Sequence, residues 1–195
     1  MTEAGWTIRA ERPEDAPLVD ALNAQSFGPG RFARAAFRLR EGVHPEKGLS
    51  FIAIERAELR GSVRFWPVIV GTTPAIMLGP LAVQSDQRGR GIGIALMERG
   101  LKEAKALGHK FVLLVGDLPY YARVGFAQVP LATRREDEGK NTPPTSRVRF
   151  PGPVDPMRIL AIALDESVSL DQLEGEVKRV RIDDPVCADG AAVGA

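Results

Sequence analysis

Hydrophobic and polar positions follow two different periods along this chain, and each period predicts a different element. Short runs rich in β-branched and aromatic residues predict strands over residues 6–9, 51–55, 61–70 and 76–83. Polar turns separate the later runs, so we expect these strands to form an antiparallel meander.

Helical spacing predicts three helices. The first begins at Pro13-Glu14-Asp15, where a proline and two acids suit a first helical turn. A second is expected over residues 31–40, with Arg31, Arg34 and Arg38 on one face, and it ends before Gly42. A third is expected over 89–107, because its apolar residues recur at helical spacing and Gly108 follows as a stop.

Residues 111–115 are continuously apolar, which is typical of a strand that is covered on both faces. We expect this strand to lie parallel to strand 76–83, across the third helix. Residues 130–157 contain six prolines and predict a long loop, 159–164 predict another strand, and 166–184 a small helix or an edge strand. The fold class is therefore mixed α/β, with a central mixed sheet flanked by helices.

Composition bounds the organisation and the partners. A chain of 195 residues with 44% hydrophobic content suits one domain, expected over residues 1–165, with 166–195 as an extension whose end is disordered. The 26 basic and 25 acidic residues nearly cancel, which argues against nucleic-acid or membrane partners. The first residues do not resemble a signal peptide, so we expect a cytoplasmic protein. Cys187 is the single cysteine, which excludes an internal disulfide and a cysteine-based zinc cluster.

A glycine-rich basic turn follows the strand that ends at Val83, and it is the strongest chemical motif in the chain. Its three glycines alternate as Gly89, Gly91 and Gly93 at the start of a predicted helix, where free backbone N–H groups and the helix dipole favour an anion such as a pyrophosphate. A P-loop is excluded because Lys and Ser/Thr are missing. A dinucleotide-binding motif is excluded because a single residue separates the last two glycines.

Arg88-x-x-Gly91-x-Gly93 after a Leu-Ala-Val strand end resembles the coenzyme-A-binding motif of the GNAT superfamily of N-acetyltransferases. An Ile-Arg-x-x-x-Pro-Glu-Asp opening at residues 8–15, the buried strand 111–115 and Tyr121-x-x-x-Gly125-Phe126 follow the order of that family. The resemblance implies the GNAT fold, acetyl-CoA as co-substrate, and two splayed central strands that hold it.

The resemblance also implies which residues bind the co-substrate. Pro80 interrupts the motif strand, and in the family this strand bulges there and leaves free backbone groups for the pantetheine arm. The expected contacts are Leu81, Ala82, Val83, Arg88, Gly89, Arg90, Gly91, Ile92 and Gly93.

Acetyl transfer to an amine develops negative charge on the thioester oxygen, and the Leu81 N–H is the expected donor to it. The leaving thiolate needs a proton. Tyr121 occupies the position of the usual GNAT acid, and its neighbour Tyr120 is the rival. The segment 116–119 lacks the asparagine that commonly contacts the co-substrate in this family.

The general base stays open among Glu55, Asp86 and Asp117, and His44 and His109 are expected outside the cleft. The predicted function is N-acetyl transfer from acetyl-CoA to a primary amine by direct attack, without a metal or a covalent intermediate. The alternatives are a CoA-binding sensor without turnover and an interaction module that uses the basic helix. The segment 27–40, Arg64, Trp66 and the proline-rich loop are expected to shape the acceptor pocket, but they do not identify the acceptor. A homodimer is compatible with the sequence.

Overall fold

The computed structural model describes residues 5–132 and 145–180. The predicted Cys187 tail lies outside them. The strands are β1 (Thr7–Ala10), β2 (Ser50–Glu55), β3 (Glu58–Val70), β4 (Thr73–Val83), β5 (Phe111–Val115), β6 (Ala127–Gln128), β7 (Val148–Arg149), β8 (Ile159–Ala163) and β9 (Gly175–Arg179). The α-helices are α1 (Ala16–Phe27), α2 (Ala35–Arg38), α3 (Ile92–Ala106) and α4 (Leu118–Tyr121).

One mixed sheet organises the chain, in the order β1-β2-β3-β4-β5-β8-β6. β2, β3 and β4 form the predicted antiparallel meander, and β5 lies parallel to β4 after the α3 crossover. β9 pairs with the far end of β3 and with β7, so an edge strand does form after residue 166. The fold class and most strand positions predicted from the sequence are confirmed.

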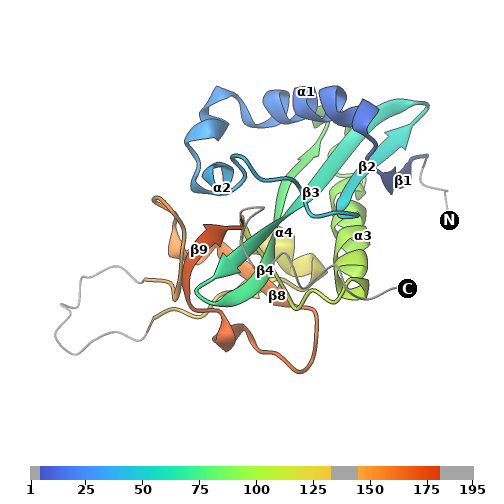
Figure 1. Ribbon diagram of the computed structural model, residues 1–195. Helices are drawn as coiled ribbons and strands as arrows, with labels where there is room; N and C mark the ends of the chain where they lie inside the picture. Colours follow the sequence, from blue (N-terminus) through green and yellow to red (C-terminus); the bar gives the residue numbers. More distant parts are fainter. Residues whose placement is uncertain (1–4, 133–144, 181–195) are drawn as a thin grey trace.

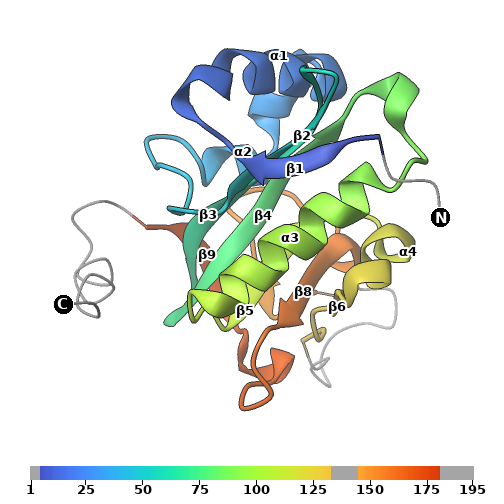
Figure 2. The ribbon, with the colours of Figure 1, turned by 90° about the vertical axis from the view of Figure 1, so that its right-hand side faces the viewer.

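Helices cover both faces of this sheet. α3 crosses one face, where Leu96 and Met97 pack against Phe65 and Val112 (Figure 2). α1 and α2 gather over the other face (Figure 1), and the buried Val19 of α1 packs there with Ile52 and Ala82. Each face of the sheet is therefore hydrophobic, which explains why β5 carries no polar alternation.

Two parts of the chain differ from the sequence prediction. The helix expected over 31–40 is broken at Arg34, whose backbone is extended (φ −74°, ψ 138°), into a 3-10 segment and the single turn α2. The break lets Phe32 meet Phe37 edge to face at 4.7 Å, a contact that helical propensity does not report. The loop predicted over 130–157 contains the short strand β7, and residues 133–144 lie outside the described part.

The central strands separate as predicted. β4 and β5 pair at Ile76–Val112 and Met77–Leu113, and no pairing is found beyond these positions. On its other edge β4 shifts register against β3, because Gly79 and Pro80 together stand opposite the single residue Arg64, which leaves one extra residue in β4. The strand therefore bends away from β5, and an opening begins at this bulge.

Helix α3 packs closely on the sheet at Gly100. A methyl group at this position would collide with the ring of Phe65, which is fully buried. No helix within residues 5–132 and 145–180 is long and apolar enough to cross a membrane.

We predict that Gly100→Ala lowers the free energy of unfolding by about 1–3 kcal/mol, because overpacking against Phe65 outweighs the gain of about 1 kcal/mol in helix propensity. Urea denaturation measures the difference. Lys102→Ala, at an exposed position of the same helix, is the control and should change it by less than about 0.5 kcal/mol. A more stable Gly100→Ala variant would contradict the close packing.

Candidate active site

Two cavities open where β4 leaves β5. The larger, of about 780 Å³, lies among α1, α2, β4 and the loop at 153–158. The smaller, of about 390 Å³, lies between the end of β4, the start of α3 and the α4 turn. Phe27, Leu81 and Tyr121 line both cavities, so these three residues stand at their junction.

The glycine-rich turn forms one wall of the smaller cavity. Gly91 is the N-cap of α3 and has a left-handed backbone (φ 82°), which glycine adopts without strain. The first N–H groups of α3 have no partner within the helix, and together with its dipole they favour an anion. The turn residues that line the cavity are Gln87, Arg88, Gly89, Gly91, Ile92, Gly93 and Ile94.

Gly93 and Tyr120 lie against each other in this wall. A methyl group on Gly93 would collide with the Tyr120 hydroxyl. The same methyl carbon would lie 3.6 Å from the ring carbon that bears this hydroxyl, which is an ordinary contact distance. Gly93 therefore permits the ring of Tyr120 to close over the start of α3.

Arg90 was expected among the contacts of the co-substrate, but its side chain is paired with a carboxylate of the protein. Its guanidinium donates to both Glu55 oxygens, at 2.6 and 3.1 Å, and it also contacts Gln87. The Glu55 contact lowers the pKa of that carboxyl. Unlike Arg88, Arg90 is not among the residues that line the smaller cavity. The motif spacing located the turn, but it could not report that a carboxylate on β2 holds this side chain.

The register of β4 decides which of its backbone groups are free. The Gln84 amide donates to the Arg60 carbonyl at 2.9 Å, so these two residues form a hydrogen-bonded pair. Since such pairs alternate along an antiparallel ladder, Ala82 also pairs with β3, whereas Leu81 and Val83 direct their N–H and C=O groups toward the side of β5. β5 does not pair with them. Two of the three predicted backbone positions therefore face the opening, and Ala82 does not.

The two tyrosines occupy different places. Tyr121 lines both cavities, while Tyr120 lines the smaller one. Their rings meet edge to face at 5.1 Å, and Tyr121 also packs edge to face on Phe126 at 6.0 Å. Burial raises the pKa of Tyr121 to about 12, so its hydroxyl stays protonated at neutral pH.

The three candidates for the general base do not line either cavity. Glu55 is held by Arg90, Asp86 accepts from Gln87, and Asp117 pairs with Arg158 at 3.2 Å. The acidic residues in the wall of the larger cavity are Asp20, Glu41 and Asp155, which the sequence did not single out.

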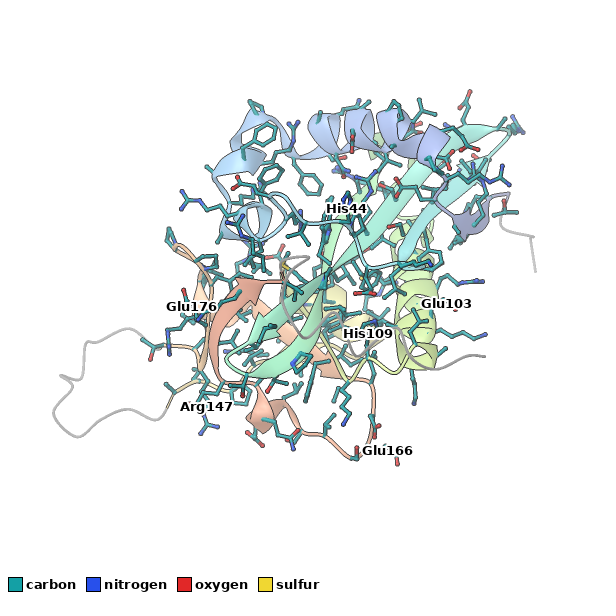
Figure 3. All side chains as sticks on the ribbon, in the orientation of Figure 1. His44, Glu103, His109, Arg147, Glu166 and Glu176 are labelled. Carbon is teal, nitrogen blue, oxygen red and sulfur yellow. The ribbon has the colours of Figure 1, made fainter. Side chains whose placement is uncertain are left out.

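The histidines do not line either cavity, as expected. His44 follows α2, and His109 follows the C-terminal end of α3 (Figure 3). Burial lowers the pKa of His109. In the described part of the chain, His, Cys, Asp and Glu side chains do not gather in groups of three that could hold a metal ion.

The larger cavity is lined by the segments that the sequence suggested for an acceptor pocket. Arg40, Arg64 and Trp66 line it, together with Asn23, which the sequence did not indicate. The Trp66 indole donates to the Gly79 carbonyl at 2.6 Å, which fixes the bulge to β3. Arg40 is the last residue of the segment that was expected to form one helix. In the structure Arg40 follows the short helix α2, which begins after the break at Arg34.

These features agree with what the comparisons show. A model of the acetyltransferase (GNAT) family matches residues 17–126, more than half of the chain, and the chain belongs to this family. It is therefore an acetyltransferase by family, as the motif predicted.

Particular relatives are known in Escherichia coli. The chain is 36% identical over 121 residues to the N-acetyltransferase YhbS of strain K12. The aligned region covers 61% of this chain and 72% of YhbS. A crystal structure of YhbS in complex with CoA aligns with 90% of this chain and 89% of its own, with a TM-score of 0.68 and 28% identity. A GNAT acetyltransferase from Brucella melitensis, solved with acetyl-CoA, shares the fold at a TM-score of 0.60 and 24% identity, covering 90% of this chain and 96% of that one.

The contact between Gly93 and Tyr120 yields a paired prediction. Gly93→Ala should weaken CoA binding at least about tenfold, because the Tyr120 ring must move into the cavity. Tyr120→Phe removes the hydroxyl that collides, so the Gly93→Ala/Tyr120→Phe double variant should regain most of the affinity. Calorimetric titration with CoA measures all four proteins. Equal losses in the single and double variants would contradict this contact.

Proposed function

We propose that the protein transfers an acetyl group from acetyl-CoA to a primary amine, by direct attack of the amine on the thioester. Acetyl-CoA binds in the smaller cavity and the acceptor in the larger one. The observation that carries this assignment is that Leu81 and Tyr121 line both cavities, so a backbone donor and a proton donor lie where the two substrates would meet.

The residues present fit acetyl-CoA. The start of α3 offers N–H groups and Arg88 to a pyrophosphate, and among the described residues no atom lies within 4 Å of the point where a Gly91 side chain would begin. The outward backbone groups of Leu81 and Val83 suit the amides of a pantetheine arm, as an added strand would. The co-substrate supplies an acetyl group already activated as a thioester.

The roles of the protein groups follow from their placement. The Leu81 N–H points toward the opening and donates to the thioester oxygen as that oxygen gains negative charge. The neutral amine forms the C–N bond, the C–S bond breaks, and the Tyr121 hydroxyl gives its proton to the departing sulfur. The proton that the amine nitrogen loses passes through solvent to the Tyr121 oxygen, which restores the acid. Because burial keeps Tyr121 protonated up to a pH well above neutrality, this acid is available throughout the physiological range.

Gly91→Asp tests the anion site. The aspartate adds a negative charge, and a side chain on a left-handed backbone, where the backbone meets the pyrophosphate. The affinity for acetyl-CoA should therefore fall at least about 100-fold. Gly108→Asp is a matched control, because Gly108 has the same φ of 82°, equally open space, and a position at the other end of α3. Calorimetry on folded protein should show normal affinity for the control. Unchanged affinity in Gly91→Asp would remove the anion site.

Tyr121→Phe tests the acid. The change keeps the ring packed on Phe126 and removes only the proton donor, so the rate of CoA release with an accepted amine should fall by roughly 10²–10⁴, with acetyl-CoA affinity nearly unchanged. Tyr120→Phe is the control and should keep its rate. The reverse result would move the acid by one residue. Binding of acetyl-CoA without turnover on any amine would instead indicate a CoA sensor.

A further inference from the structure

Arg40 presents an unusual charge to the larger cavity. Its Nε is buried and has no hydrogen-bond partner among the described residues. The guanidinium carbon lies 5.9 Å from the centre of the Trp66 ring, and no ion pair with a described carboxylate is found. Burial and the neighbouring Arg64 lower the pKa of Arg40 to about 10, so it remains a cation at neutral pH.

Other arginines that line the cavity have hydrogen-bond partners, unlike the buried Nε of Arg40. Arg64 donates to both oxygens of Glu11 at 2.5–3.2 Å and to Asp20 at 3.0 Å. Arg158 pairs with Asp117 at 3.2 Å, and Arg31 donates to a backbone carbonyl at 2.9 Å. The protein thus neutralises the other cation beside Arg40 with two carboxylates and leaves Arg40 itself without one.

A buried and unpaired cation destabilises the protein that contains it, because desolvation is not compensated. Such a group is retained at a binding site when a ligand supplies the missing anion. The edge formed by Nε and one Nη of a guanidinium matches a planar carboxylate, with which it forms two parallel hydrogen bonds. One uncompensated positive charge also matches the single charge of a carboxylate.

Arg40 lies next to the reaction centre. The point where a Gly79 side chain would begin is 3.0 Å from an Arg40 Nη and 3.9 Å from the Leu81 nitrogen. Both nitrogens are therefore within 4 Å of one point in the bulge. An anion held by Arg40 and an amine that attacks a thioester held by Leu81 would be separated by only a few bonds.

We propose, given the acetyl transfer proposed above, that the acceptor is a small amino carboxylate, such as a free amino acid, whose carboxylate Arg40 binds. A second buried and unpartnered atom in the same cavity, Oδ1 of Asn23, offers an acceptor to a polar hydrogen of such a molecule. Arg40 fixes the carboxylate, and the amine reaches the junction at Leu81 and Tyr121.

The test uses the free amino acids and the corresponding amino acid amides, which retain the amine and lose the carboxylate. Each compound is offered with acetyl-CoA while free CoA is followed, and each is also added to CoA-saturated protein while the melting temperature is measured. We expect at least one acid to be acetylated and to stabilise the protein, with kcat/KM about 10- to 100-fold above that of its amide.

Three variants separate recognition from structure. Arg40→Met should lose the preference for the acid over the amide, and Arg40→Lys should keep part of it, because the charge remains without the bidentate edge. Arg38→Met is the control, since Arg38 lies on α2 but does not line the cavity. The Arg40→Met protein should melt no lower than the wild type, because it replaces an unpaired buried charge with an apolar chain.

The outcomes distinguish the two proposals. An acid that binds through Arg40 without being acetylated supports the recognition and overturns the proposed activity. Amides that are acetylated as well as the acids, or a preference that survives in Arg40→Met, overturn the recognition and leave the activity standing. Absence of any stabilisation by the acids relative to the amides also overturns the recognition.

Discussion

The separation of β4 from β5 is the constraint on which the site depends. Two adjacent parallel strands normally continue to pair, but here pairing is found at Ile76 and Met77, before the Gly79–Pro80 bulge. Proline has no N–H to donate to a neighbouring strand, and the extra residue of the bulge bends the remainder of β4 away from β5. The Trp66 indole holds the bulge in place through the Gly79 carbonyl. Backbone groups that would stabilise a sheet are thereby left without a strand partner, and the proposed function assigns them to the co-substrate.

Around this opening, the chain accepts several locally unfavourable arrangements. A tyrosine is buried deeply enough to raise its pKa to about 12, an arginine lacks a counter-ion, and an asparagine oxygen lacks a donor. These groups line the larger cavity. The remaining core is apolar and closely packed on both faces of the sheet. Two of the buried atoms without a hydrogen-bond partner, Arg40 Nε and Asn23 Oδ1, thus lie where a ligand could satisfy them, whereas Arg60 Nε and Ser62 Oγ lie outside both cavities. The core supplies the stability that offsets such groups.

The sequence predicted those features that depend on local pattern. Continuous apolar residues identified β5, alternating and β-branched runs identified β2 to β4, and alternate glycines identified the start of α3. Features that depend on tertiary contacts were missed. The break at Arg34, which brings Phe32 against Phe37, was not predicted, and the position of Arg90 follows from Glu55, 35 residues away along the chain. The segment 27–40 was expected at the acceptor pocket, but the unpaired state of Arg40 could not be recognised, because an arginine in a sequence does not show whether a carboxylate faces it.

The two cavities draw on different parts of the chain. Every residue that lines the smaller cavity falls between Ser26 and Arg123, within the segment 17–126 that matches the family. The larger cavity is completed by Pro153, Val154, Asp155 and Arg158, which lie after that segment, in a loop between β7 and β8. Mutations in this later loop can reshape the larger cavity while the glycine-rich turn remains untouched. Under the proposed function, acceptor choice is therefore free to diverge during evolution at a different pace from the chemistry it serves.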